Sequence, residues 1–182
     1  MAKEKSKKPA KPAYVDPNKY SGYGAAMARK PGDPMAVEWQ AANGAKIAEA
    51  TTPAALAAHL KDAASAAALL ARVKEAYAGD PLDLTVIAAV SQYSMDASVG
   101  RPGGCQKVCK TPGAAPCPRK VWNLALIDAF RKSKDEYVQT FLLDQLRWCC
   151  CRACKDDVRN LRGCAVSGNV KAFLDWVVDE IK

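Results

Sequence analysis

The sequence predicts an all-α fold, and three observations lead to this prediction. Apolar residues make up 49% of the 182-residue chain, with many alanines among them, and segments suited to β-strands are scarce. Apolar residues recur at three- and four-residue spacing, most clearly over 134–154 and 168–181. In Asp33-Pro34, Thr52-Pro53 and Asp80-Pro81, an N-cap acceptor precedes a proline at the first helical position. Each of these three pairs should therefore begin a helix.

The helices can be placed in order along the chain. We expect them at about 34–50, 53–61, 64–78, 81–96, 119–131, 134–154, 156–162 and 168–181. Gly79 is a helix stop, because glycine readily adopts the conformation that ends a helix. Ser167 should cap the last helix, which carries a regular apolar stripe. The stripe consists of Val170, Phe173, Leu174, Val177, Val178 and Ile181.

The stretch from Ser133 to Cys154 has the strongest helical pattern. Ser133 and Glu136 form a predicted capping box at its start. One face then points to the core, and Cys151 and Cys154 lie on a neighbouring stripe nearer solvent. The core-side residues are Val138, Phe141, Leu142, Leu146, Cys149, Cys150 and Ala153.

The N-terminal segment differs from the rest in composition. Residues 1–32 are rich in Lys, Pro and Gly and poor in branched apolar residues, so we expect a disordered basic tail. Residues 1–30 carry eight basic and two acidic residues, and so account for most of the net charge of +8. Residues 33–182 should form one all-helical domain, interrupted by a Cys/Gly/Pro-rich loop at 99–118.

That loop and its border carry several cations without an acidic residue. Clustered cations are typical of phosphate binding, so the tail and the 101–120 loop are candidates for binding nucleic acid or another anion. The candidate anion-binding residues are Arg101, Lys107, Lys110, Arg119 and Lys120.

Eight cysteines form the most informative chemical feature of the chain. They are Cys105, Cys109, Cys117, Cys149, Cys150, Cys151, Cys154 and Cys164. The even count favours disulfides that fasten the loop to the following helices, although the pairing cannot be deduced from the sequence. As an alternative, the spacing allows structural zinc at Cys105, Cys109, Cys151 and Cys154. Mostly free thiols are the third possibility.

The sulfur state bears on both reactivity and compartment. Arg147, Arg152 and Lys155 would lower the pKa of a neighbouring thiol, so Cys151 or Cys154 is a candidate reactive thiol. Oxidised cysteines would indicate a periplasmic or secreted protein, although the chain as given shows no secretory signal. Reduced cysteines would indicate a cytoplasmic one.

The tryptophans and the single histidine are interpreted as structural. Trp39, Trp122, Trp148 and Trp176 fall one to a helix and are expected to anchor the core. His59 lies in an alanine-rich segment with no serine or acidic partner that can be assigned to it. The residues therefore assign no catalytic group, which favours a non-enzymatic protein.

Two predicted helical hairpins are similar to each other. The first hairpin consists of Leu69 to Val73, the Asp80 cap and Ile87 to Met95. In the same order, these parts match Leu126 to Phe130, the Ser133 cap and Thr140 to Trp148 of the second hairpin. In this pattern residues 53–181 resemble the HEAT-like family of α-helical repeats. The resemblance implies helical hairpins stacked as a short α-solenoid, with a concave surface for protein or nucleic acid and usually no catalysis. An irregular helix bundle is the alternative arrangement.

These observations favour a non-enzymatic binding or scaffolding module for a protein partner, stabilised by cysteine cross-links. The alternatives are nucleic-acid binding through the tail and loop, and a thiol redox or structural-zinc protein. No cofactor other than that alternative zinc is expected, and no small-molecule ligand is indicated. We also expect no transmembrane helix, because no apolar segment is long enough.

Overall fold

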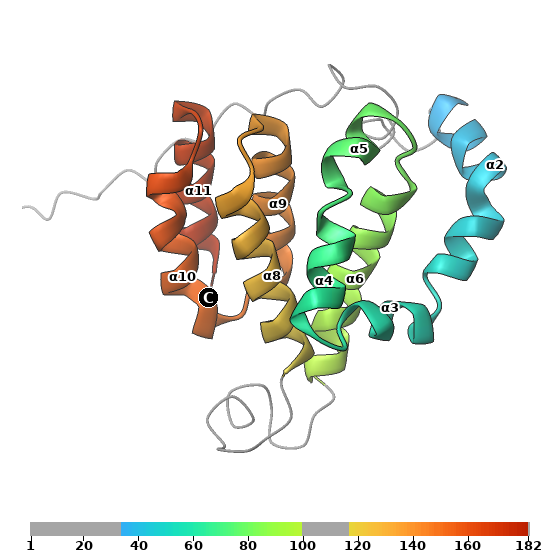
Figure 1. The fold of residues 1–182 in the computed structure, drawn as a ribbon, viewed down its shortest axis with the longest axis horizontal. Coiled ribbons are helices and arrows are strands. Elements are labelled where there is room, and N and C mark those ends of the chain that lie inside the picture. Colours follow the sequence, from blue (N-terminus) through green and yellow to red (C-terminus); the bar gives the residue numbers. More distant parts are fainter. Residues whose placement is uncertain (1–33, 100–116, 182) are drawn as a thin grey trace, which may run out of the picture.

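The structure is a computed structural model that describes residues 34–99 and 117–181 (Figure 1). These residues form helices joined by short connections, with no strand among them, so the all-α prediction is confirmed. The predicted tail at 1–32 and nearly all of the predicted loop at 99–118 lie outside the described residues.

Within each of the two described ranges, few residues separate successive helices. The α-helices are α2 (Pro34–Ala50), α3 (Pro53–His59), α4 (Ala63–Leu70), α5 (Val73–Ala78), α6 (Leu82–Val99), α8 (Pro118–Lys132), α9 (Glu136–Cys149), α10 (Lys155–Arg159) and α11 (Gly168–Glu180). The 3₁₀ helices are η2 (Arg152–Cys154) and η3 (Asn160–Cys164). The predicted helix at 64–78 is divided into α4 and α5, and the one at 156–162 into α10 and η3.

Several predicted helix starts are formed by the expected side chains. The Thr52 hydroxyl accepts a hydrogen bond from the backbone N–H of Ala55, before α3. The Asp80 carboxylate accepts one from the N–H of Leu82, and the Ser167 hydroxyl accepts one from the N–H of Val170. In each case a short polar side chain satisfies an N–H group that has no partner within the helix.

The start of α9 differs from the prediction. Its N-cap is Asp135, whose carboxylate accepts hydrogen bonds from the N–H groups of Tyr137 and Val138. Ser133 instead follows the end of α8, and the Glu136 carboxylate accepts a hydrogen bond from the Ser167 hydroxyl at 2.8 Å. The predicted capping box is therefore wrong, because Glu136 bonds to α11 rather than back to the start of its own helix.

The end of α9 differs as well. The helix stops at Cys149 instead of continuing to Cys154, and the backbone is extended at Cys150 and Cys151 before η2 begins. As a result Ala153, predicted on the core side, is exposed. Cys149 thus ends α9, Cys150 and Cys151 lie in the extended connection, and Cys154 is the last residue of η2.

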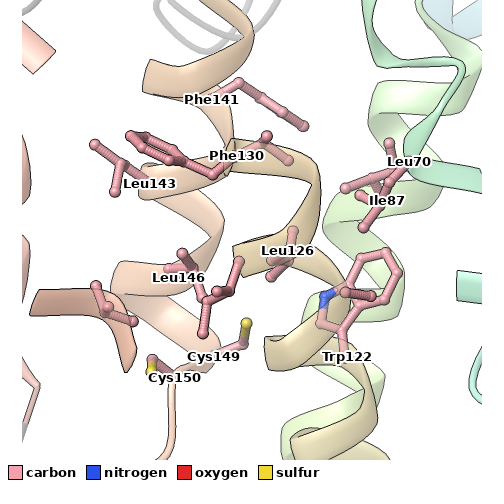
Figure 2. Packing of buried hydrophobic residues seen from close by; sticks show 14 of the residues in the cluster. Leu70, Ile87, Trp122, Leu126, Phe130, Phe141, Leu143, Leu146, Cys149 and Cys150 are labelled. Carbon is pink, nitrogen blue, oxygen red and sulfur yellow. The ribbon is translucent and has the colours of Figure 1, made fainter. Parts of the chain in front are cut away.

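Helix α8 lies at the centre of the packing. It packs against α4, α6 and α9, while α9 also packs against α6 and α11 (Figure 1). One continuous apolar cluster fills the space between these helices. Figure 2 shows part of it, with Trp122, Leu126 and Phe130 of α8 between side chains of neighbouring helices. The largest fully buried side chains are Trp122, Phe130, Leu69, Leu84, Ile87, Leu126, Ile127, Leu142, Leu143, Leu146, Leu161 and Leu174.

The tryptophans do not all anchor the core. Trp122 is fully buried, as predicted, and its indole N–H donates to the Ser91 hydroxyl at 2.9 Å. Trp148, in contrast, is 61% exposed, so the prediction is wrong at this position. The Arg147 guanidinium lies 4.2 Å from the Trp148 ring centre and 5.0 Å from that of Trp176, on α11. Trp148 is therefore covered on one face by a cation rather than by the core.

The buried amide of Gln139 joins three parts of the chain near the start of α9. Its nitrogen donates to the carbonyl oxygens of Phe130, Ser133 and Cys164 at 3.0–3.2 Å. Its oxygen accepts from the N–H of Val166 at 3.0 Å. One side chain thereby holds the end of α8 and the connection between η3 and α11 against α9.

Among the described residues, no single helix has the length and apolar character needed to cross a membrane. The segments Pro53–His59 and Ala63–Tyr77 reach the required length and hydropathy only when taken together, and they are bent by 100° relative to each other.

Candidate functional site

Six of the predicted site cysteines are described, and five of them are buried. Cys149 and Cys150 lie on the core side, as predicted (Figure 2). Cys151 and Cys154 were predicted nearer solvent, but their side chains are only 5% and 1% exposed. They are buried because the chain turns back against the helices after Cys149, so the helical stripe on which the prediction rested does not continue.

No two sulfur atoms of the described cysteines lie at disulfide-bonding distance from each other. A disulfide requires about 2.05 Å between sulfurs. Cross-links between Cys117 and the cysteines after α9, one part of the predicted fastening, are therefore not present. The predicted links through Cys105 and Cys109 lie outside the described residues. Cys151 and Cys154 do come together, with their sulfur atoms 3.6 Å apart.

The four predicted zinc ligands are only partly described. Cys151 and Cys154 are close enough to supply two ligands, while Cys105 and Cys109 lie outside the described residues. Within 34–99 and 117–181, no group of three or more His, Cys, Asp or Glu side chains could hold a metal ion.

Two side chains of α8 hold the connection that carries the cysteines. Arg119 donates from Nε to the carbonyl oxygen of Cys149 at 2.6 Å and from Nη2 to that of Cys150 at 2.9 Å. Asn123, one helical turn later, donates to the Cys149 carbonyl at 3.1 Å and accepts from the N–H of Cys151 at 2.9 Å. Its amide nitrogen also lies 3.3 Å from the Cys149 sulfur. Backbone groups at the helix end thus find partners on α8.

Cys151 occupies a helix start. It is the N-cap residue of η2, and its carbonyl oxygen accepts from the N–H of Cys154 at 2.9 Å. Its sulfur accepts no capping hydrogen bond from the N–H groups of η2, although those of Ala153 and Cys154 lie near enough to lower its pKa.

The thiols of this cluster differ sharply in acidity. The pKa of Cys151 is lowered to about 6, chiefly by the hydrogen bond that it shares with the Cys154 thiol, with further help from backbone N–H groups and the charge of Arg119. The pKa of Cys154 is raised, because its proton is held in that hydrogen bond and because it is buried. Burial raises the pKa of Cys149 and of Cys150 to about 12. Of these four thiols, Cys151 is therefore the one that ionises at the lowest pH.

Three buried serines of α6 lie close to Cys117 and Trp122. Ser91, Ser94 and Ser98 recur at helical spacing, and Ser98 lies 3.4 Å from the Cys117 sulfur. The hydroxyl of Ser98 donates to the Ser94 carbonyl, and that of Ser94 to the Ser91 carbonyl. These hydroxyls are satisfied within α6 and allow α8 to approach closely.

The sequence interpretation missed Asn123 and the role of Arg119. Asn123 is fully buried among apolar residues of α8, and a buried amide requires hydrogen-bond partners. The sequence could have indicated this role, because Asn123 lies on the apolar face of a predicted helix. Arg119, a predicted anion-binding residue, donates to two carbonyl oxygens of the protein. Lys120 is exposed, and Arg101, Lys107 and Lys110 lie outside the described residues.

A groove of about 890 Å³ lies between α4 and α8, toward the start of α9. Small and apolar residues form its floor, among them Ala67, Ala125 and Val138. Charged residues of both signs stand along it, including Lys74 and Asp128. Gln139 and Asp135 are near this end of α9, whereas the cysteines follow its other end.

The close contact between Cys151 and Cys154 and the groove are thus the two features of the described residues that suggest a function. Comparisons of the chain with protein-family models, curated proteins and solved structures find no match.

Proposed function

We propose that Cys151 and Cys154 form a thiol–disulfide exchange site. The observation that carries this proposal is the 3.6 Å contact between their sulfur atoms at the start of η2. Two cysteines separated by two residues at a helix start can close a disulfide after a small movement, since the sulfurs need to approach by less than 2 Å. This was one of the alternatives that the sequence suggested.

The chemistry follows from the different acidities of the two thiols. The Cys151 thiolate attacks one sulfur of a substrate disulfide, and the other substrate sulfur leaves as a thiolate and takes up a proton. Cys154 then loses its proton and attacks the Cys151 sulfur, which breaks the mixed disulfide and releases the second substrate thiol. Two electrons pass from the cysteine pair to the substrate disulfide, and the reverse sequence oxidises a dithiol. The substrate class is a protein or low-molecular-weight disulfide.

The lower pKa of Cys151 supports the role of first nucleophile for this residue. Its exposed fraction is 5%, against 1% for Cys154. Cys154 keeps its proton until the mixed disulfide has formed.

The test is a redox titration of the purified protein in glutathione buffers, followed by acid quenching and mass spectrometry. Trypsin cleaves after Arg147, Arg152 and Lys155, so Cys151 and Cys154 fall into different peptides, 148–152 and 153–155. We expect oxidation to remove two hydrogens and to link these peptides through Cys151. The variants Cys151→Ser and Cys154→Ser should lose the link, whereas the matched control Cys164→Ser should keep it.

Two outcomes would overturn the proposal. One is a link that joins other cysteines, or no link at any glutathione ratio. The other is a tightly bound zinc ion that protects Cys151 and Cys154 from oxidation, which would favour the structural-zinc alternative. A metal assay on the freshly purified protein should therefore accompany the titration.

A second candidate function is that of a binding module for a protein partner. We propose that α4–α5 with α6, and α8 with α9, are successive units of a HEAT-like stack. The packing of α4 against α8 and of α6 against α9 supports this arrangement. The groove between α4 and α8 is a concave surface with an apolar floor, and such surfaces are used for recognition.

The binding proposal can be tested on a partner trapped by the thiol site. Cys154→Ser leaves the mixed disulfide at Cys151 unresolved, so a trapped partner can be identified and purified. Calorimetry should then show that Ala67→Glu, which places a charge in the groove, weakens non-covalent binding at least about tenfold. The exposed helix residue Lys171 provides the control variant Lys171→Glu. Equal affinities of the two variants would remove the groove from the proposal.

A further inference from the structure

We propose that the groove between α4 and α8 receives an amphipathic helix of another protein, and that acidic side chains of this helix pair with Lys74 and Lys134. This inference rests on the binding module proposed above and specifies the chemistry of its partner. The floor of the groove, its helical walls and its unpaired cations each favour such a partner.

Short side chains cover one face of α4. Four exposed alanines that line the groove recur there at three- and four-residue spacing, which places them on one side of the helix. They are Ala64, Ala67, Ala68 and Ala71, the last being the C-cap residue. Side chains this small allow another helix to approach closely. From Ala64 to Ala71 the helix rises by about 10 Å, so a partner helix would place the apolar side chains of about two turns in the groove.

Both walls of the groove are α-helices, which favours a helix over an extended peptide as the ligand. A helix uses its backbone N–H and C=O groups in its own hydrogen bonds, so α4 and α8 offer no open edge with which a strand could pair. The backbone of an extended peptide would lose water in the groove without gaining partners there. A helix, in contrast, enters with its backbone groups already paired.

The charges along the groove are positive once its internal pairs are set aside. The Asp128 carboxylate lies 2.7 Å from the Lys132 ammonium, and the Asp135 carboxylate accepts the capping hydrogen bonds of α9. Lys74 and Lys134 also line the groove and are exposed. Among the described residues, no acidic group lies within ion-pair distance of either lysine. Acidic side chains of a partner would therefore complement them.

Other parts of this chain match the groove less well. Residues 1–33 carry basic residues in excess, and residues 100–116 carry three basic residues and no acidic one. Both segments contain several prolines, which disfavour a helix interior. A second copy of the chain would bring the exposed Asp179 and Glu180 of α11, but the apolar stripe of that helix is buried in its own core. An acidic amphipathic helix from a separate protein is therefore the favoured occupant.

The test begins with a phage-displayed library of random peptides of about 16 residues, or roughly four helical turns, selected on the full-length protein. A reductant prevents disulfides between peptide and protein, so that selection reports non-covalent binding alone. Each round is counter-selected against the double variant Ala67→Gln, Ala71→Gln, in which two neutral side chains occupy the groove. We expect enriched peptides with apolar residues three and four apart and with more acidic than basic residues. Their helical circular dichroism should increase on binding.

Charge reversal then tests the two lysines. Calorimetry with an enriched peptide should show that the double variant Lys74→Glu, Lys134→Glu binds it about tenfold more weakly, and that the difference shrinks as salt is raised. Replacing the acidic residues of the peptide by lysine should restore binding to this variant. The control Lys120→Glu, Lys171→Glu has the same net charge but changes two exposed lysines outside the groove, so it should bind as the wild type does.

The outcomes separate this inference from the proposed binding function. If no peptide prefers the wild type over the folded groove variant, the groove is not a binding surface and both proposals fail. Enriched peptides without helical spacing or acidic residues, or with equal affinity for the Lys74→Glu, Lys134→Glu variant, would overturn the inference and leave the groove as a binding surface. A dimer in light scattering that the groove variant separates would overturn it in favour of a second copy of the chain.

Discussion

The two ends of α9 are held by buried or partly buried polar side chains in similar ways, but with different chemical consequences. At the start, the Gln139 amide bonds to three carbonyl groups and one N–H. Beyond the end, Arg119 and Asn123 of α8 bond to two carbonyl groups and one N–H. Both arrangements satisfy backbone groups between elements that would otherwise remain unpaired in the interior.

The two ends of α9 differ in the titratable side chains that lie near them. Around Gln139 the participating side chain is neutral and cannot titrate. At the other end, the break places Cys151 at a helix start beside a second thiol and a cation. Cys149, two residues earlier, has the same side chain and the opposite pKa shift. The comparison shows that two thiols in one short stretch can have opposite pKa shifts, because a hydrogen bond with the neighbouring Cys154 thiol dominates at Cys151 and burial dominates at Cys149.

The largest expected effect is selective alkylation within the run of cysteines. At pH 7 we expect Cys151 to react with iodoacetamide on the order of a hundredfold faster than Cys149, since a larger thiolate fraction outweighs the lower intrinsic nucleophilicity of an acidic thiol. The rate at Cys151 should fall as the pH drops below about 6. Equal labelling of the two residues in the folded protein, measured by tandem mass spectrometry, would contradict the proposed difference.

The next effect concerns the other end of the helix. Gln139→Leu leaves one N–H and three carbonyl groups without this partner, and should lower the free energy of unfolding by about 2–4 kcal/mol. Urea denaturation measures this change. The exposed glutamine of α6 gives the control Gln92→Leu, which should change stability by less than about 0.5 kcal/mol. The midpoint of Cys151 alkylation should not move in Gln139→Leu, and a shift would mean that the two ends are coupled.

A smaller effect is expected from the resolving thiol. Cys154→Ala removes the hydrogen bond that contributes most to the low pKa of Cys151, so that pKa should rise. Alkylation of Cys151 at pH 7 should slow by about tenfold as its thiolate fraction falls. Cys164→Ala, outside the cluster, should leave the rate unchanged. If the Cys154 variant reacts at the wild-type rate, the backbone N–H groups and Arg119 are sufficient without Cys154.

The smallest effect distinguishes the two possible caps of α9. Asp135→Ala removes the acceptor for two backbone N–H groups and should cost about 1 kcal/mol in the free energy of unfolding. Ser133→Ala removes one hydrogen bond with the Asp135 backbone outside the helix and should cost less. Urea denaturation of both variants measures the difference. The reverse order of effects would restore the predicted capping box.

Local signals in the sequence were sufficient for much of the fold. Ser167 caps α11 as predicted, and its stripe from Val170 to Ile181 is buried. Thr52 and Asp80 also cap helices as predicted. These features depend on residues within about one helical turn of each other, so they can be inferred without knowing the tertiary packing.

The errors arise where distant residues determine the local structure. Periodicity over 134–154 predicts one helix, but the partners that favour a break, Arg119 and Asn123, lie in the preceding helix. In the candidate site, the closeness of Cys151 and Cys154 follows from their spacing, whereas their burial and unequal acidity required the tertiary structure.

The bonds between helices span similar distances along the chain. Trp122 and Ser91 are 31 residues apart, as are Glu136 and Ser167, while Cys149 lies 30 residues from Arg119 and Cys164 lies 25 from Gln139. Each bond therefore closes a loop about as long as one helical hairpin. Closing a loop of this length costs only a moderate amount of conformational entropy. Contacts between residues that are near in sequence are associated with rapid folding. We therefore expect the chain from α6 to α11 to fold one helical hairpin at a time. Each hairpin that forms supplies hydrogen-bond partners for the preceding hairpin.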